Sequence, residues 1–489
     1  MEVKTETKKT GFFALIRDHN TILHKVMTYG VAIALIALCV FLTPGGDALN
    51  PAWGWLIIAF LFYYALVSQR ILETLIFGCA IGVALYYGKD FLNGISETTF
   101  STMELEDFVW IVLLCGLLNV FNKLLSRAGS MKSFGKVIMK HAKTDKQLRF
   151  CSWLLQFPLF FDDYMTIAVG GSILTPIYDE RKIPREEGAF IVHTLAEPLR
   201  VLLPITSWTA FMAGLFESGG LTDANGSGFL AFCKTIPFSF YAWVSIIGCL
   251  LFALGVIPKI GPMKHPKPEE YMPLDEEEED DGKKHGTLID FFLPIVAMIA
   301  AAKLFDWDLV PALLVVLPCV FAYYMIRGII TTKDVEGCLI DGFGDFMYLD
   351  ILFVASYALG GVLETTGYIN YLVSVAQNTV SPALLPVMLF VIFCCSEAAM
   401  SLNWSLMLIA FPVVIPLAQG IGANVYLTAA AVISAGCFGC HLCYVCDYTS
   451  MTGKVCGLDP ARHASTCVPY ALMFAAVTAV LYLACGFLM

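Results

Sequence analysis

Long apolar stretches follow one another along almost the whole chain, and they restrict what it can fold into more than any other feature. Most are about as long as a helix that crosses a bilayer. Hydrophobic residues make up 58% of the chain and charged residues only 15%, with a mean hydropathy of +0.73, whereas charged residues are about a quarter of a soluble protein. The sequence therefore predicts an all-α, polytopic membrane protein. The apolar stretches are residues 26–43, 52–68, 71–88, 108–122, 150–178, 188–216, 231–257, 288–304, 309–326, 344–363, 383–420, 425–447 and 468–488.

Charge and cysteine content exclude other classes of protein. The formal charge is −11, but the acidic run DEEEEDD at residues 275–281 supplies most of the excess, so the acidity is local. Lys and Arg gather in short loops between apolar stretches, which excludes a nucleic-acid surface. The 17 cysteines lie mostly inside apolar stretches, unlike those of a disulfide-rich secreted protein. We expect free thiols that pack as small residues.

Basic residues in the short loops predict the orientation of the chain. Residues 123–149 carry eight Lys and Arg, whereas the loop before them, residues 88–107, carries a single Lys. The first segment is therefore predicted to be cytoplasmic and the second external, which also places the N-terminus inside. The orientation stays consistent only if residues 150–178 enter and leave on the same side, as a re-entrant hairpin. The polar N-terminus lacks the features of a secretory signal, so we expect it on the mature protein.

A charged linker at residues 258–287 divides the chain into an N-terminal half, residues 1–257, and a C-terminal half, residues 288–489. The Pro, Glu, Asp and Lys content of this linker predicts a solvated segment on the cytoplasmic side. Each half is expected to hold one structural repeat.

Two polar strings in the first half are similar to strings in the second. FFDDYMT at residues 160–166 is similar to CDYTSMT at 446–452, and PITSWTAF at 204–211 is similar to SLNWSLML at 401–408. Such similarities are typical of transporters built on inverted repeats, in which broken helices meet at the membrane midplane. The order of the two strings differs between the halves, so the matching of elements stays open.

Ionisable side chains inside apolar stretches indicate functional or structural sites, because they are costly there. Inserting a charged residue at the bilayer centre costs about 2.5–3.5 kcal/mol even on the scale that gives the lowest values. Asp162 and Asp163 are adjacent and cannot share one helical face, so we expect different roles, with Asp163 as the member that titrates; a solvated pair at a hairpin tip is the alternative. His193, Glu197 and Arg200 stand at i, i+4 and i+7 and share one helical stripe. They form either a structural ion network or the lining of a cavity for a polar solute.

The segment Gly436–Gly453 is the best candidate for a cation site. Its glycines permit unwinding, and Asp447, Tyr448, Thr449 and Ser450 supply oxygen ligands that suit a hard cation such as Na+. Four cysteines recur here at every third residue, which spreads them too widely around a helix to converge on a metal and favours helix packing. Other polar residues interrupt the apolar stretches and are predicted, with His193, Glu197 and Arg200, to bind a solute. They are Thr206, Ser207, Trp208, Ser401, Asn403 and Trp404.

At these residues the chain resembles the NhaC-type sodium/proton antiporters of bacterial inner membranes. FFDDYMT and PITSW are similar to the family's FxDDY and PISxW, and FGCHLCYVCDYTSMTG at residues 438–453 resembles its FGDHxSPxSDTT. The resemblance implies the fold of the ion transporter superfamily, with two inverted repeats, re-entrant hairpins and broken helices, a homodimer, and a transport domain that moves as an elevator. It also implies Na+ and/or H+ as coupling ions, no cofactor, and the bacterial cytoplasmic membrane.

Departures from the family's pattern bear on the substrate. His193 stands where the family usually has Asp, Glu197 where it has Ala, and Cys440 where it has the Asp of FGDH. Fewer carboxylates weaken the expectation of plain Na+/H+ exchange, while His, Glu and Arg on one stripe suit a charged organic solute. The family's other aspartates are kept, at Asp162, Asp163 and Asp447.

The sequence therefore predicts a secondary antiporter that exchanges Na+ and/or H+, with a small charged organic solute as a further substrate. The alternative is a Na+- or H+-coupled carrier of an organic acid or amino acid without net Na+/H+ exchange. A carboxylate that binds either a proton or a cation, exposed to one side of the membrane at a time, links the gradients of the two ions.

The chain has no GxxxxGK[ST] nucleotide loop, which argues against a primary pump. Its polar strings hold no enzymatic pair of nucleophile and base. Expected partners are lipid, the transported ion or solute, and a second copy of the chain.

Overall fold

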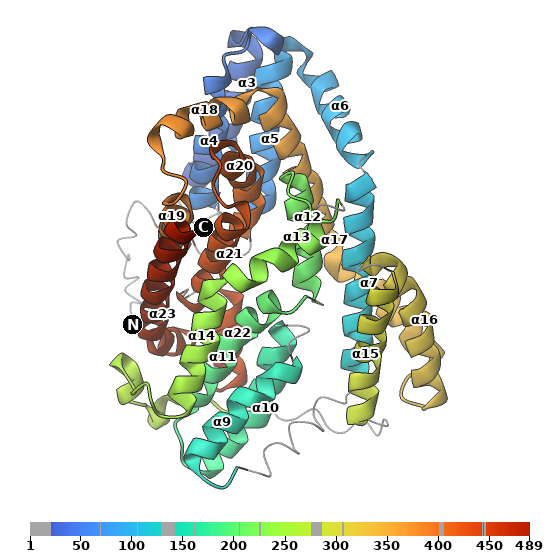
Figure 1. Cartoon of the computed structure of the whole chain (residues 1–489), viewed down its shortest axis with the longest axis vertical. Helices are drawn as coiled ribbons and strands as arrows, with labels where there is room; N and C mark the ends of the chain where they lie inside the picture. The colour runs from blue at the N-terminus through green and yellow to red at the C-terminus, as the bar shows by residue number, and fades with distance from the viewer. Residues whose placement is uncertain are drawn as a thin grey trace, which may run out of the picture. The chain divides into compact units, whose positions relative to one another are not determined.

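The computed structural model describes residues 21–68, 70–104, 106–128, 142–159, 163–204, 206–223, 226–274, 286–305, 308–400, 405–442, 444 and 446–489. Within these residues every regular element is a helix, which confirms the predicted class (Figure 1). The chain forms two compact units. The smaller contains residues 1–105 and 351–379, and the larger contains residues 106–350 and 380–489.

The smaller unit is a bundle of apolar helices in which α5 is central. Both α3 and α4 pack against α5, and α6 follows it after a short 3-10 turn. Gly78 and Gly82 allow this packing, because a Cβ atom there would collide with Leu61 and Val362. The helices are α2 Ile22–Lys25, the π-helical turn Val26–Gly30, α3 Val31–Leu42, α4 Gly54–Ser68, α5 Ile71–Tyr87, α6 Phe91–Met103, the end of α17 Thr332–Thr365, and α18 Tyr368–Thr379.

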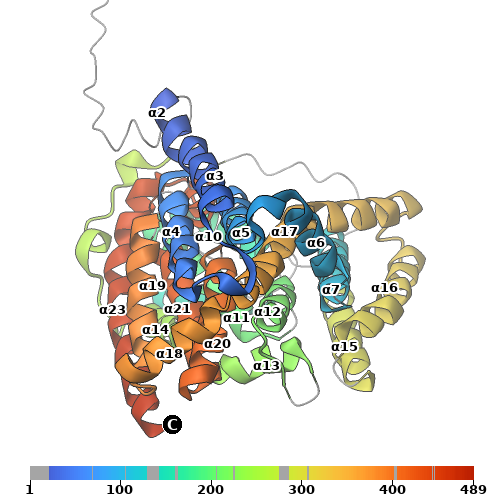
Figure 2. The same ribbon diagram turned by 90° about the horizontal axis from the view of Figure 1, so that it is seen from above.

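The larger unit is built around α11 and α21, two helices that are buried along almost their whole length. Helices α14 and α23 pack against both of them, while α9 and α10 cover α11, and α19 and α20 cover α21 (Figures 1 and 2). The helices are α7 Glu106–Arg127, α9 Asp145–Gln156, α10 Asp163–Glu180, α11 Arg185–Leu202, α12 Ser207–Ser218, α13 Gly228–Thr235, α14 Phe240–Ala253, α15 Leu288–Leu304, α16 Leu309–Ile326, α19 Leu385–Met400, α20 Ser405–Ile421, α21 Val425–Leu442, α22 Asp447–Val455 and α23 Pro460–Leu488.

One order of helices occurs twice in this unit. Two consecutive helices, α9 and α10, are followed by a long buried helix, a break and a short helix, α11 and α12; α19 to α22 repeat this order. The break after α11 has a local cause: Leu203 precedes Pro204, which favours extended backbone, and Leu203 is extended. Thr206 then caps the start of α12 with its side chain.

Two of the longest apolar stretches hold two helices each. Residues 188–216 are divided between α11 and α12, and residues 383–420 hold both α19 and α20. The order of helices and the similar strings give different matches. By order, α10 corresponds to α20 and α12 to α22. By sequence, FFDDYMT at the start of α10 is similar to CDYTSMT at the start of α22. The order of elements is therefore the better guide to which segments correspond.

Six described helices are long and apolar enough to cross a membrane, or seven if the bent pair Gly228–Phe238 and Phe240–Ala253 is one span. This supports a multi-pass membrane protein. The six are Ile22–Leu42, Ile71–Met103, Leu309–Ile326, Thr332–Thr365, Val425–Leu442 and Pro460–Leu488.

The first part of the predicted linker, residues 258–274, is largely exposed but fastened to the larger unit. The Tyr271 hydroxyl donates a hydrogen bond of 2.5 Å to Glu186 near the start of α11, and the Met272 amide donates one of 2.9 Å to the Gly457 carbonyl. Burial and the Glu186 contact raise the pKa of Tyr271 above its ordinary value. This part of the predicted linker is therefore largely exposed and is also held against the larger unit.

Candidate functional site

Arg200 lies near the end of α11 and is the centre of a buried ionic network. Its Nη1 atom is 2.8 Å from Oδ2 of Asp163, the first residue of α10, and its Nη2 atom is 2.8 Å from Oε2 of Glu197, one turn earlier in α11. The side chains of Asp163, Glu197 and Arg200 are only 1%, 3% and 10% exposed. One guanidinium therefore contacts two buried carboxylates from different helices.

Two aromatic residues also contact this guanidinium. The Tyr448 hydroxyl of α22 donates a hydrogen bond of 2.6 Å to Glu197 Oε2 and accepts one of 2.9 Å from Arg200 Nη2. The Trp208 ring of α12 lies 4.9 Å from the guanidinium carbon, a distance at which the ring face attracts a cation. We call Asp163, Glu197, Arg200, Trp208 and Tyr448 the Arg200 network.

Elementary electrostatics explains why these groups occur together. A buried charge is tolerated only when it is paired and hydrogen-bonded, and the Arg200 contacts provide this for both carboxylates. The three ionised side chains sum to a formal charge of −1. The network joins α10, α11, α12 and α22, all of which begin or end near a helix break. Ions bind at such places in membrane transporters, because broken helices leave polar backbone available.

The break after α11 is tied directly to the network. The Thr206 hydroxyl donates a hydrogen bond of 3.2 Å to the carbonyl of Arg200 and accepts one of 3.2 Å from the Thr209 amide. Thr206, which the sequence predicted to bind a solute, therefore has a structural role, because it caps α12 and binds the backbone of Arg200. Trp208, another predicted solute residue, is brought to Arg200 itself.

The predicted cation segment lies beside this network at the start of α22. Asp447 is the first residue of α22, but its side chain lies outside the described part of the structure. The Thr449 hydroxyl is buried and lies 3.3 Å from the sulfur of Cys446, whereas Ser450 is exposed. The phenol of Tyr448, between Asp447 and Thr449, is a described side chain of this segment that reaches the network.

The glycines of the cation segment have a different role from the one predicted. Gly436 and Gly439 lie inside α21 and Gly453 lies inside α22, so none of them unwinds a helix. At Gly439 a Cβ atom would stand 2.5 Å from Oε2 of Glu397, a buried carboxylate of α19. The absence of a side chain therefore lets this carboxylate lie against the backbone of α21.

His193 does not join Glu197 and Arg200, although all three lie along α11. Its ring contacts His463 of α23, with Nδ1 and Nε2 2.6 Å apart, and its own Nε2 is 3.1 Å from the Cys440 carbonyl. The single stripe predicted from the sequence is therefore divided between two neighbourhoods. Other predicted site residues lie outside the described part of the chain: Asp162, Ser401, Asn403, Trp404 and the side chain of Ser207.

Sequence reasoning missed two residues that the structure places in buried polar clusters. His463 and Cys467 fall in α23 beside His193, and their spacing of four residues could have revealed that they share a helical face. The role of Tyr448 was only partly seen, because the sequence suggested an oxygen ligand for a cation instead of a hydrogen-bond partner for Glu197 and Arg200.

The sequence profile of the Na+/H+ antiporter family matches residues 199–487, more than half of the chain and the part that contains Arg200, Trp208 and Tyr448. The chain belongs to the Na+/H+ antiporter family. Membership confirms the family predicted from the sequence. As a member of this family the protein is a secondary transporter, and its apolar helices make it a multi-pass membrane protein.

Similar proteins agree with this family and fold. An uncharacterized protein of Haemophilus influenzae is 25% identical, over 86% of this chain and 88% of its own length. The fold is similar to that of the YdaH transporter of Alcanivorax borkumensis, with a TM-score of 0.59, 11% identity, and coverage of 81% of this chain and 88% of that one. It is also similar to MtrF of Neisseria gonorrhoeae, with a TM-score of 0.50, 13% identity, and coverage of 93% and 97%. These two similarities show the fold alone.

Proposed function

We propose that this member of the Na+/H+ antiporter family is an antiporter of a bacterial cytoplasmic membrane that exchanges Na+ and/or H+, with its N-terminus in the cytoplasm. The observation that carries the proposal is the Arg200 network, in which Asp163 and Glu197 share one buried guanidinium beside two helix breaks. Buried intramembrane charges of this kind mark ion and proton pathways.

The network suggests how two gradients become linked. Asp163 and Glu197 carry two negative charges against the single positive charge of Arg200, so binding of one Na+ or one H+ brings the three side chains to neutrality. Na+ and H+ are thus attracted to the same carboxylates, and binding of one weakens the attraction for the other. Exchange follows if the site opens to one side of the membrane at a time.

Asp447, Thr449 and Ser450 are the proposed further cation ligands, since Asp447 starts the helix that carries Tyr448 into the network. The proposed organic solute is small and charged, because a guanidinium under an aromatic ring suits a carboxylate. The alternative function, a Na+- or H+-coupled carrier of an organic acid or amino acid without net Na+/H+ exchange, would use the same groups.

The twofold order of helices supports a proposal of two inverted repeats, α9–α12 and α19–α22, each with a hairpin and a broken helix. Rigid-body movement of such a pair around a fixed site is a general way to alternate access. An elevator movement and a homodimer remain part of this proposal.

Counterflow of labelled organic acids and amino acids in proteoliposomes, with and without a sodium gradient, tests the choice of substrate. We expect the gradient to accelerate uptake of at least one charged solute by the wild-type protein. Asp447→Asn is expected to abolish this acceleration while the protein elutes from size exclusion as wild type does, because the substitution removes a negative charge but keeps the size of the side chain. Wild-type sodium dependence in Asp447→Asn would show that this residue binds no coupling ion.

A further inference from the structure

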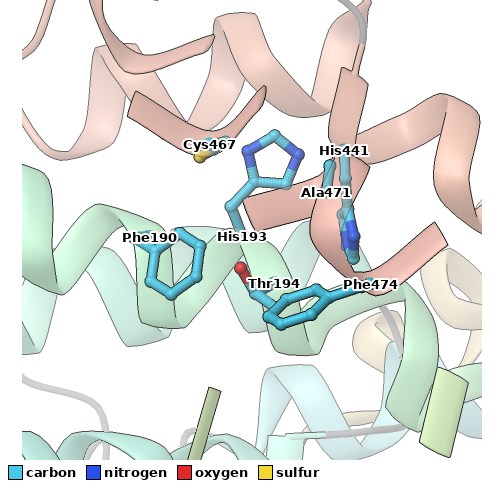
Figure 3. Close-up of a pocket in the computed structure, with 7 residues that line it drawn as sticks. All are labelled: Phe190, His193, Thr194, His441, Cys467, Ala471 and Phe474. Carbon is cyan, nitrogen blue, oxygen red and sulfur yellow. The ribbon is translucent and has the colours of Figure 1, made fainter. Parts of the chain in front are cut away.

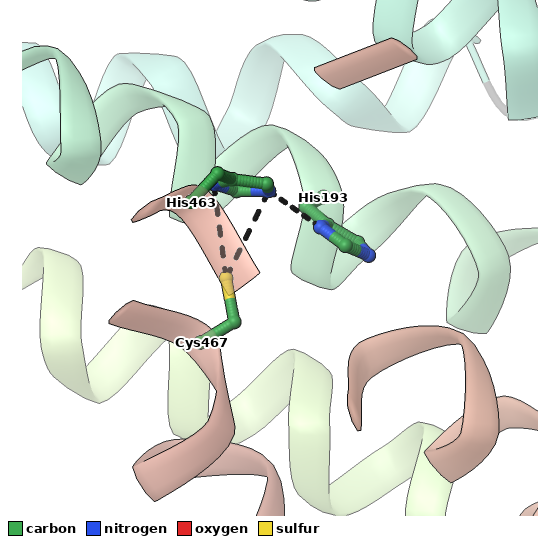
Figure 4. A group of neighbouring side chains, drawn as sticks. All are labelled: His193, His463 and Cys467. Atoms are coloured by element: carbon green, nitrogen blue, oxygen red, sulfur yellow. Dashed lines mark hydrogen bonds between the residues drawn. The ribbon is translucent and has the colours of Figure 1, made fainter. Parts of the chain in front are cut away.

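Three metal-ligating side chains meet between α11 and α23, away from the contacts of Arg200. His193 Nδ1 is 2.6 Å from His463 Nε2, and the His463 ring nitrogens are 3.9 and 4.0 Å from Cys467 Sγ. One ligand atom from each residue lies within 4.8 Å of the other two. Figure 4 shows the His463 ring between the imidazole of His193 and the thiol of Cys467. We call these three residues the His–His–Cys cluster.

The cluster is buried and chemically suited to a transition metal. His193, His463 and Cys467 are 1%, 0% and 3% exposed. Imidazole nitrogen and thiolate sulfur are the ligands that zinc prefers. His463 and Cys467 are four residues apart on α23, a spacing that turns two side chains to the same helical face. The third ligand comes from another helix, so the set is drawn from two places in the chain.

The hydrogen bond of His193 prepares its ring for coordination. Its Nε2 atom lies 3.1 Å from the carbonyl oxygen of Cys440, and a carbonyl only accepts hydrogen bonds, so Nε2 carries the proton. The lone pair of this neutral ring is then on Nδ1, which faces His463. A histidine that ligates a metal usually donates its other N–H to a carbonyl or carboxylate in this way.

A fourth nitrogen lies close to the cluster. The His441 ring of α21 is 5.6 Å from that of His193, measured between ring centroids, and its Nδ1 contacts the Tyr241 hydroxyl at 2.9 Å. Its Nε2 is buried and has no hydrogen bond of normal geometry to any described residue. Figure 3 shows His193, His441 and Cys467 lining one pocket.

We propose that His193, His463 and Cys467 form a site for a divalent ion of the zinc class, with His441 as the nearest residue to complete a tetrahedral set. The site is separate from the proposed ion-coupling function, because none of its ligands contacts Asp163, Glu197 or Arg200 in the described hydrogen bonds. A bound ion cross-links α11 to α23.

The metal ion binds in exchange for a proton that the ligands release. Zinc lies about 2.0–2.1 Å from nitrogen ligands, so the two ring nitrogens separate to roughly 3.3 Å in a tetrahedral site and their mutual hydrogen bond is lost. The proton of that bond moves to Nδ1 of His463, which leaves Nε2 as the ligand. The thiol proton of Cys467 goes to solvent. Each divalent ion thus binds two neutral imidazoles and one thiolate and releases one proton.

Cobalt(II) provides an optical test on the purified, tag-free, full-length protein after treatment with a chelator. We expect one cobalt ion per chain, an absorption band from thiolate-to-cobalt charge transfer, and loss of both signals when zinc is added. Zinc is also expected to raise the melting temperature, since a ligand that binds only the folded state stabilises it. Cys467→Ser should remove the charge-transfer band, and His463→Gln should weaken cobalt binding by more than about a hundredfold, beyond the effect of changing an outer-shell residue.

Matched control variants distinguish metal binding at this cluster from metal binding at other cysteines and histidines. Cys115→Ser on α7 and His24→Gln in α2 change buried residues outside the cluster, and both should bind cobalt as wild type does. The absence of stoichiometric cobalt binding by the wild-type protein would overturn the proposal, as would a charge-transfer band that survives in both cluster variants. His463 and His193 would then be a hydrogen-bonded structural pair. These readouts do not depend on transport, so their failure leaves the antiporter proposal intact.

Discussion

Replacing Arg200 with glutamine is expected to abolish transport and to lower the free energy of unfolding by about 3–5 kcal/mol, the usual cost of removing one partner from a buried ion pair. The guanidinium contacts Asp163 and Glu197, both of which are almost fully buried. Without it, two carboxylates remain in a place where water cannot solvate them. Thermal unfolding in detergent and uptake into proteoliposomes measure the two effects.

A double variant separates stability from function. Arg200→Gln combined with Asp163→Asn removes one positive and one negative charge, so part of the lost stability should return while transport stays absent. Arg200→Lys keeps the charge but loses the two-pronged contact with Asp163 and Glu197, and an intermediate stability is expected. If Arg200→Gln were as stable and as active as wild type, the network would be neither structural nor functional.

Glu197→Gln is expected to remove sodium dependence while the protein remains folded. Glutamine keeps an oxygen that accepts hydrogen bonds from Tyr448 and Arg200, but it carries no charge for a cation or proton to neutralise. Uptake as a function of sodium concentration measures this loss.

Tyr448→Phe is the matched control for Glu197→Gln. It removes the 2.6 Å hydrogen bond to Glu197 but leaves the carboxylate charge in place. We expect a lower sodium affinity with sodium dependence retained. Equal and complete loss in both variants would mean that the hydrogen bond, and not the charge, is what transport needs.

The sequence predicted the helical class and the key charged residues because each follows from strong local signals. Bilayer-length apolar stretches have few alternatives to helix, and Asp163, Glu197 and Arg200 stood out because charges are rare and costly in apolar stretches. Their spacing also predicted that Glu197 and Arg200 share a face, which their contact confirms.

Contacts between segments far apart in the chain could not be predicted from the sequence. Nothing local indicates that Asp163 meets Arg200 or that Tyr448, far along the chain, donates to Glu197. His193 shows the same limit, since its helical stripe suggested Glu197 and Arg200 as neighbours, whereas the packing of α23 brings His463 to it. Helical periodicity gives the direction of a side chain but not the element that it meets.

Sodium-driven proton movement is the direct measure of the proposed Na+/H+ exchange. Proteoliposomes that contain a pH-sensitive dye are given an inward sodium gradient with the membrane potential clamped. We expect the lumen to become alkaline with wild-type protein, because entering Na+ displaces H+ outward, and we expect Glu197→Gln to abolish the change. An unchanged lumenal pH with wild-type protein that still takes up a solute would contradict Na+/H+ exchange, and an undiminished response in Glu197→Gln would contradict the role of the Arg200 network.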